Sequence, residues 1–324
     1  MSTNFKSYLI IIFVFITNLF AGLITIDNNV YPIGEYTTLV AAHENAAIGD
    51  TIYVIPSLTD YEGIAVSKTL TFLGVGFELD LWPGQASLVS SSISGTMIFD
   101  EGSDGSILEG FDGEFNVSIN TDFISVKRNL LYSINFYENT SSSIIIQNKI
   151  GGIIDDPGSS LQDVTFINNI INTMYFNDYD NTSGFHFINN NFISGSTLYL
   201  GSNSVLINNI FVSSNSVACV ECIFSNNMWS GDPGSQYEGN GNMVNIDMNA
   251  VFINYSDGDY HLLPESPAIG SGQDGADMGI YGGEAPFIDG GFPGIPAIYE
   301  LDVENVGSQI HGLDVIIRAK SNNE

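Results

Sequence analysis

The segment from Ile124 to Trp229 repeats one short pattern of apolar and polar positions. The clearest copies read VTFINNII from Val164, FHFINNNF from Phe185 and SVLINNIF from Ser204. In each copy, apolar residues alternate with mixed ones up to a pair of asparagines, and an apolar position usually follows two residues after the first asparagine. Alternation with period two is typical of a strand that buries one face. The pattern predicts a strand, an asparagine-marked bend and a second inward-facing segment in each copy.

Six segments align on this pattern at steps of 18 to 21 residues. The alignment gives a first asparagine column of Arg128, Asn148, Asn168, Asn189, Asn208 and Asn226. One such unit cannot close its own core, but stacked units pair at a strand spacing of about 4.8 Å. Asparagine suits the bend because it tolerates the left-handed region and its amide can bond the next bend. We therefore predict an all-β fold, a parallel β-solenoid.

The asparagine column on coils of this length resembles the asparagine ladder of right-handed parallel β-helix proteins, the pectate-lyase-like superfamily. Residues 36–76 resemble the entry of that fold, with a short helix before the first coil, and residues 259–283 resemble its closing coil. The resemblance covers roughly residues 30–285 and implies a right-handed parallel β-helix. It does not fix an activity, because the fold carries lyases, hydrolases, epimerases and non-enzymes.

Three regions follow along the chain. Residues 1–22 have a cation, a short apolar run and small residues at the end, as in a secretory signal peptide. Residues 23–288 form the predicted β-helix domain, with a capping helix over 36–47 whose apolar side holds Leu39, Val40 and Ala42. Residues 289–324 form a Gly/Pro-rich linker and a β tail, which could pair as a hairpin. We expect this tail to cap the C-terminal edge, or else to serve in docking or sorting.

The charge balance narrows the partners. The chain has 37 acidic and 7 basic residues and a formal net charge of −30. Such a surface repels nucleic acid and anionic lipid, whose binding depends on Lys and Arg. No apolar stretch beyond the signal segment is long enough to insert the mature chain into a membrane. We therefore expect a secreted or cell-surface monomer, in which Cys219 and Cys222 could form a short disulfide.

Three cations are predicted to cluster. Arg128 follows Lys127, and the alignment places Lys149 one coil later, at a Cα separation of roughly 6 Å from Arg128. Cations there could support β-elimination from a uronate, by offsetting its carboxylate and by taking the proton. The resemblance implies basic residues on the outer wall, often with calcium, but the longer motifs of family lyases are absent. The alternative is that Lys127, Arg128 and Lys149 pair with surrounding acids.

Two other kinds of site can be considered. Asn120-Thr121-Asp122, Asp155-Asp156 and Gly184-Phe185-His186 follow the order of motifs in the polygalacturonase branch of the family, but Phe185 replaces a glycine and Asp156 precedes a turn. Calcium could bind carboxylates spaced two to four residues apart in acidic loops. The first candidates are Asp100, Glu101 and Asp104, and the loops NDYDNTS and YSDGDYH are similar.

Aromatic residues complete the picture. Tyr175, Tyr179, Tyr199 and Tyr237 are predicted in or near loops, where they could stack on sugars, whereas Trp229 is predicted to pack in a column with Phe192 and Phe211. A groove along stacked coils suits a polymer, so a polysaccharide or another glycan is the expected partner. The sequence favours a secreted, carbohydrate-associated β-helix protein without a complete catalytic motif. The alternatives are a polysaccharide lyase, then a glycoside hydrolase, and finally a structural adhesin.

Overall fold

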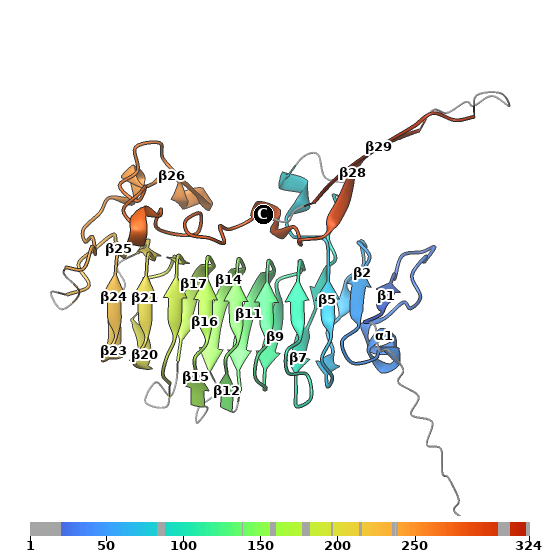
Figure 1. The fold of residues 1–324 in the computed structure, drawn as a ribbon, viewed down its shortest axis with the longest axis horizontal. Coiled ribbons are helices and arrows are strands. Elements are labelled where there is room, and N and C mark those ends of the chain that lie inside the picture. Colours follow the sequence, from blue (N-terminus) through green and yellow to red (C-terminus); the bar gives the residue numbers. More distant parts are fainter. Residues whose placement is uncertain are drawn as a thin grey trace, which may run out of the picture.

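The protein is a parallel β-solenoid in the computed structural model (Figure 1). The structure describes residues 21–82, 88–137, 139–155, 160–176, 182–195, 197–213, 216–234, 237, 239–303 and 312–321. Most of the predicted signal segment lies outside these residues. In the described part of the chain there is one α-helix, α1 (Leu39–Asn45), and no helix there is long and apolar enough to cross a bilayer. The all-β prediction is confirmed.

One side of the solenoid is a ten-stranded parallel sheet that gains one strand from most coils. Its strands, in spatial order, are β1 (Leu23–Ile26), β2 (Thr51–Val54), β5 (Thr71–Leu73), β8 (Ile107–Glu109), β10 (Ser125–Lys127), β13 (Ile144–Ile146), β16 (Thr165–Ile167), β18 (His186–Ile188), β21 (Val205–Ile207) and β24 (Ile223–Ser225).

A second side is a nine-stranded parallel sheet, in which the six strands from β11 onward each begin just after an asparagine bend. Its strands are β4 (Ala65–Val66), β7 (Thr96–Phe99), β9 (Phe115–Ile119), β11 (Leu130–Phe136), β14 (Lys149–Asp155), β17 (Ile170–Tyr175), β19 (Asn191–Phe192), β22 (Ile210–Phe211) and β25 (Met228–Trp229).

Short two-stranded pairs complete the coils. They are β3 (Tyr61–Glu62) with β6 (Ile93–Ser94), β12 (Asn139–Ser141) with β15 (Ser160–Gln162), and β20 (Leu198–Ser202) with β23 (Val217–Val220). Cys219 on β23 is disulfide-bonded to Cys222, and the Cys222 Sγ accepts a hydrogen bond from the Ser204 N–H at 3.2 Å. The predicted short disulfide is therefore present.

The interior is filled by the alternating apolar positions. Phe166, Phe187 and Leu206 are in register on successive strands and are fully buried. Phe192, Phe211 and Trp229 stack with ring centroids 4.7 Å apart at each step, which confirms the predicted column. His186 lies between the buried Phe185 and Phe187 and is exposed, as the alternation with period two predicts.

Two adjacent columns of residues, mostly asparagine, form the bend, and each has a different structural role. The second residue of each pair is buried and forms the ladder, whose members are Asn129, Asn148, Asn169, Asn190, Asn209 and Asn227. Each ladder amide donates to the Oδ1 of the next at 2.9 to 3.1 Å. The first residue of each pair has a left-handed φ between 50° and 59°, at Arg128, Gln147, Asn168, Asn189, Asn208 and Asn226.

The sequence alignment was wrong by one residue in one coil. Asn148 belongs to the buried ladder, and Gln147 occupies the left-handed position beside Asn168. Accordingly Ile145, not Ile146, is in register with the buried Phe166. The error arose because this coil has glutamine where later coils have the first asparagine.

The chain itself covers the part of the outer face of the nine-stranded sheet that lies next to the asparagine bends, whereas Tyr132 and Tyr175, farther along that face, are exposed. Residues 271–292, which we call the strap, run back along the solenoid toward its N-terminal end (Figure 1). The left-handed column holds it: Asn208 Oδ1 accepts from the Gln273 N–H, and Asn189 and Asn168 donate to carbonyls between Asp277 and Gly282. Residues 259–283 are thus an outer cover, not the closing coil that the resemblance implied.

This cover creates a second hydrophobic core outside the solenoid. Leu130, Ile170, Ile210 and Met228 are in one outward-facing column, and they pack against strap residues such as Met278 and Ile280. The sequence had placed this column inside the solenoid. Its apolar character is real, but the partner is the returning chain.

The two ends differ from expectation in detail. Helix α1 lies beside β1 at the N-terminal end (Figure 1), with Leu39 and Ala42 buried, whereas Val40 is exposed. The tail forms the predicted antiparallel hairpin of β28 (Pro296–Val303) and β29 (Val315–Ser321). This hairpin leaves the solenoid near β5 and projects away from it, so it does not cap the C-terminal edge (Figure 1).

Candidate functional site

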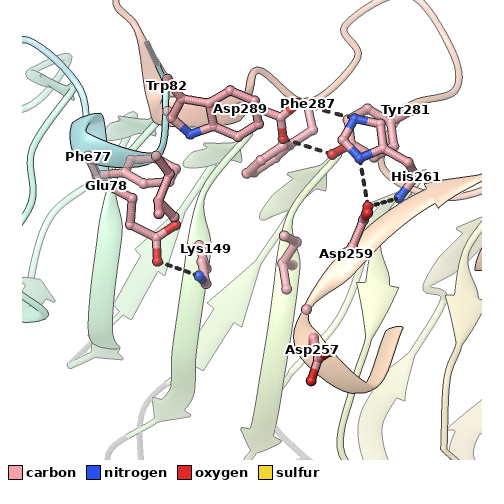
Figure 2. A pocket seen from close by; sticks show the side chains of 14 residues that line it. Phe77, Glu78, Trp82, Lys149, Asp257, Asp259, His261, Tyr281, Phe287 and Asp289 are labelled. Carbon is pink, nitrogen blue, oxygen red and sulfur yellow. Dashed lines mark hydrogen bonds and ion pairs between the residues drawn. The ribbon is translucent and has the colours of Figure 1, made fainter. Parts of the chain in front are cut away.

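A cavity of about 340 Å³ lies on the outer wall, where four segments of the chain meet (Figure 2). One wall is the turn around the 3₁₀ helix η1 (Leu79–Leu81), and the floor is the start of β14 and β17. The opposite wall comes from the β26 (Phe252–Asn254) and β27 (Asp259–Leu262) hairpin, including the 3₁₀ turn η5 (Tyr255–Asp257) between them. The strap and the 3₁₀ turn η7 (Asp289–Gly291) close the cavity.

Backbone contacts hold the η1 turn against the end of the strap. The Phe77 N–H donates to the Gly290 carbonyl at 2.8 Å. Gly76 has φ +112°, and a Cβ atom there would lie only 2.3 Å from the same carbonyl oxygen. Only glycine fits such a position. The cavity wall is therefore built by a close approach between segments more than 200 residues apart.

A salt bridge crosses one side of the cavity. Lys149 lies in the outward column of the nine-stranded sheet, in register with Leu130 and Ile170. Its Nζ atom is 2.6 Å from Glu78 Oε1 on the η1 turn. The two side chains are 41% and 32% exposed, so this ion pair faces solvent and a ligand could reach it.

An imidazole lies between two carboxylates on the other side (Figure 2). His261 Nδ1 is 2.7 Å from Asp259 Oδ1, and His261 Nε2 is 3.3 Å from Asp289 Oδ2. Burial alone would raise the pKa of Asp259, but hydrogen bonds from the His261 backbone and ring hold it below its ordinary value. The network links β27 to the end of the strap.

Aromatic rings line the upper part of the cavity. Tyr281 stacks on His261 with centroids 4.4 Å apart, and its hydroxyl donates to Asp289 Oδ1 at 2.8 Å. Burial, helped by the nearby carboxylates, raises the pKa of this hydroxyl. Phe287 packs between Tyr281 and Phe77, and Trp82 lines the cavity while half-exposed.

Most polar groups of this cavity are paired with one another, and the exception is the exposed carboxylate of Asp257. Both ring nitrogens of His261 face carboxylate oxygens, the Tyr281 hydroxyl donates to Asp289, and Lys149 donates to Glu78. A general base needs a free lone pair within reach of the substrate proton. In this arrangement the imidazole and the ammonium are paired, and a ligand meets a surface of aromatic rings and carboxylates.

The predicted cluster of three cations is divided between two cavities. Lys149 lines the cavity described above, whereas Lys127 and Arg128 line a second one with Glu109 and Gln147. The one-residue error in register explains the difference, because Lys149 is in register with Leu130 and therefore lies two residues beyond the position of Arg128.

Arg128 is engaged in fixing the structure. Its Nε atom donates to Gln147 Oε1 at 2.7 Å, and its Nη1 atom donates to the Phe292 carbonyl at 3.0 Å and lies 3.2 Å from Glu109 Oε1. Its side chain is only 12% exposed. Burial lowers the pKa of the guanidinium, and the charge of Glu109 opposes that shift. Arg128 thus fastens the end of the strap to two coils.

The calcium candidates form bonds within the solenoid. Asp100 Oδ1 accepts from Asn120 at 2.7 Å, and Asp104 Oδ1 accepts from the Thr121 hydroxyl at 2.7 Å. The bond from Thr121 is the main reason why the pKa of Asp104 is lowered. Glu101 is exposed in the same turn. Across the described ranges, no group of three or more His, Cys, Asp or Glu residues is arranged to hold a metal ion.

The fragments that follow polygalacturonase order do not line the cavity. Phe185 is buried in the core, Asp155 is buried at the end of β14, and Asp156 lies outside the described residues. Of the tyrosines proposed to stack on sugars, Tyr175 is 61% exposed and Tyr199 is 39% exposed. Tyr237 is buried and donates to the Val217 carbonyl, and Tyr179 lies outside the described residues.

Sequence reasoning found Lys149 but missed most of its neighbours. The missed residues are Phe77, Glu78, Trp82, Tyr281, Phe287 and Asp289. Asp257, Asp259 and His261 lie in the loop YSDGDYH, which drew attention only as a possible calcium loop. Comparisons of the chain with family models, with curated proteins and with solved structures found no match.

Proposed function

We propose that this protein binds a saccharide in the cavity between the η1 turn and the strap, and that it acts by binding without turnover. The main supporting observation is that two partly exposed aromatic rings, Trp82 and Tyr281, line the same cavity as the polar residues Glu78, Lys149 and Asp257. Binding sites for small ligands typically pair apolar walls with a few polar groups. His261 and Lys149 are each paired with a carboxylate, and this pairing favours binding over catalysis.

The proposal includes an extracellular setting and kinship with the pectate-lyase-like superfamily. The N-terminal apolar run with its single lysine supports export. The parallel coils and the asparagine ladder support the kinship, since both occur in that superfamily. In this proposal the protein is a secreted or surface-held β-helix that attaches to a glycan.

The cavity contains its own fluorescent reporter. The chain has two tryptophans, of which Trp229 is fully buried in the core and Trp82 lines the cavity. Titration of the mature protein with tetrasaccharides of neutral, amino and uronic sugars should change Trp82 emission in a saturable way. A Trp82→Ala variant, followed by calorimetry, should bind roughly fivefold more weakly, equivalent to about 1 kcal/mol of aromatic contact.

The matched control for this variant is Tyr175→Ala. Tyr175 is an aromatic residue with 61% exposure on β17, and it does not line the cavity. Its removal should leave the affinity unchanged. Equal losses in the two variants, or no saturable signal with any of the sugars, would contradict the proposal.

A polysaccharide lyase is the second candidate function. The observation that favours it is Lys149, a cation that reaches a sugar-sized cavity from its floor. A lyase would release unsaturated products from a uronate polymer, detectable by ultraviolet absorbance. Turnover that is lost in Lys149→Ala would establish this function instead of binding alone.

A further inference from the structure

More acidic than basic side chains line the cavity, and this excess indicates which ligand the cavity would favour. This step rests on the proposed saccharide binding and concerns which class of sugar is taken. Four carboxylates and two basic groups line the cavity: Glu78, Asp257, Asp259, Asp289, Lys149 and His261. The carboxylates are in excess whether or not His261 is protonated.

Each basic group is already matched by a carboxylate. Lys149 Nζ is 2.6 Å from Glu78 Oε1, and His261 lies between Asp259 and Asp289. A uronate carboxylate that sought Lys149 would have to displace Glu78. It would also enter a surface whose formal charge over the whole chain is −30, which adds repulsion over the screening length of about 8 to 10 Å.

Asp257 is the carboxylate left without a basic partner in the cavity. Its Oδ2 atom accepts a hydrogen bond from the neutral Asn254 amide at 2.7 Å, and the residue is exposed on the η5 turn, at the lower edge of the cavity in Figure 2. It forms no ion pair with any residue in the described part of the chain. A protonated amine could therefore approach Asp257 without breaking an existing ion pair.

The aromatic lining is compatible with the same ligand. Trp82 presents a half-exposed indole in the cavity. An indole face attracts a cation and also packs against the apolar face of a sugar ring. We propose that the cavity selects a saccharide bearing protonated amino groups, and that the Glu78–Lys149 pair excludes uronates.

The test compares three tetrasaccharides, built from glucosamine, N-acetylglucosamine and galacturonic acid. Binding to the mature protein is measured by Trp82 fluorescence and calorimetry near pH 6, where protein carboxyl groups are ionised. The glucosamine tetramer should bind most tightly and the galacturonate tetramer most weakly. Added salt should weaken glucosamine binding but not N-acetylglucosamine binding, because only the former carries charge.

Two variants probe the charges separately. Asp257→Asn should weaken glucosamine binding roughly two- to fivefold, the range expected for an exposed ion pair, while N-acetylglucosamine binding stays unchanged. Glu78→Gln should free Lys149 and strengthen galacturonate binding by a similar factor. Glu265→Gln is the matched control, since Glu265 is an exposed carboxylate between β27 and the strap that does not line the cavity.

The outcomes separate this inference from the proposed function. If galacturonate binds as well as glucosamine or better, the inference on charge is wrong while saccharide binding stands. If Asp257→Asn and Glu265→Gln have equal effects, Asp257 does not receive the amine. If none of the three sugars binds, both the inference and the proposed function fail.

Discussion

The two long sheets are built by the same coils, but apolar residues on their outer faces are buried to different extents. On the nine-stranded sheet, Ile170, Ile210 and Met228 point outward and are covered by the strap. On the ten-stranded sheet, Ile146, Ile167, Ile188 and Ile207 also point outward, but they remain half-exposed. Similar residues therefore form a core on one side and a surface on the other.

The difference shows where a solenoid acquires a site. A bare coil surface offers only shallow relief, because each strand repeats the one below it. Where the strap and the β26–β27 hairpin lie over that surface, non-repeating residues such as Trp82, Asp257 and His261 are brought beside Lys149. The repeat supplies the scaffold, and the returning chain supplies the chemistry.

The largest effect is expected from truncating an isoleucine on each face. Ile210→Ala removes a fully buried side chain beneath the strap and should lower the free energy of unfolding by about 2 to 5 kcal/mol. Ile207→Ala, three residues earlier, removes a half-exposed side chain and should cost roughly 1 kcal/mol or less. Denaturant unfolding of the two variants measures the difference.

Equal losses at these two positions would break the comparison. They would mean that the strap does not bury the nine-stranded face in solution. In that case the cavity that depends on the strap would also be in doubt, and Trp82 emission should be the same in a variant that lacks residues 271–324.

A smaller effect of opposite sign is expected at Asn191. This asparagine interrupts the apolar column between Ile170 and Ile210, is fully buried, and has no hydrogen-bond partner for its amide among the described residues. Leucine has nearly the same shape. Asn191→Leu should therefore raise the free energy of unfolding by about 1 to 2 kcal/mol, because an unsatisfied buried amide is replaced by an apolar group.

The control for this change is its neighbour in the ladder. Asn190 donates to Phe166 and Asn209 and accepts from Asn169, so Asn190→Leu leaves several buried groups unpaired. That variant should lose about 3 kcal/mol or more. A loss in Asn191→Leu as well would indicate that the amide is satisfied, by a buried water for example.

The contrast between Asn190 and Asn191 also shows how far the sequence could lead. The repeat length and the alternation of apolar positions predicted the coils, the aromatic column and the stacked asparagines. Each of these features depends on the same residue type recurring at the same position of successive coils. The sequence could not show which asparagine of each pair adopts the left-handed bend and which forms the buried ladder, because asparagine suits both positions. Only the coils with Arg128 and Gln147 distinguish the two columns, because these residues occupy the left-handed position and are not members of the ladder.

The cavity could not be predicted for a different reason. The strap has no period, and its contacts join residues far apart in the sequence, from 65 positions for Asn208 with Gln273 to 164 for Arg128 with Phe292. In the sequence alone, an apolar column that faces outward under the strap cannot be distinguished from one that faces the interior of the solenoid. Lys149 was identified because cations are rare in this chain, and rarity is visible without the fold.

The smallest effect concerns the attachment of the hairpin to the strap and its dependence on pH. The pKa of Asp259 is held below its ordinary value in the folded protein by bonds from His261. A carboxylate of this kind adds stability above its unfolded pKa of about 3.9, and that stability is lost as pH falls through the folded pKa. Asp259→Asn should therefore reduce the thermal midpoint slightly near pH 6 and make the midpoint fall less steeply as the pH is lowered.

The control is Asp60→Asn, at an exposed carboxylate outside the cavity, which should keep the wild-type dependence of the thermal midpoint on acid pH. Carboxyl resonances followed by nuclear magnetic resonance give the direct reading: if Asp259 titrates above 3.9, which is about its unperturbed value, the carboxylate does not stabilise the covered face.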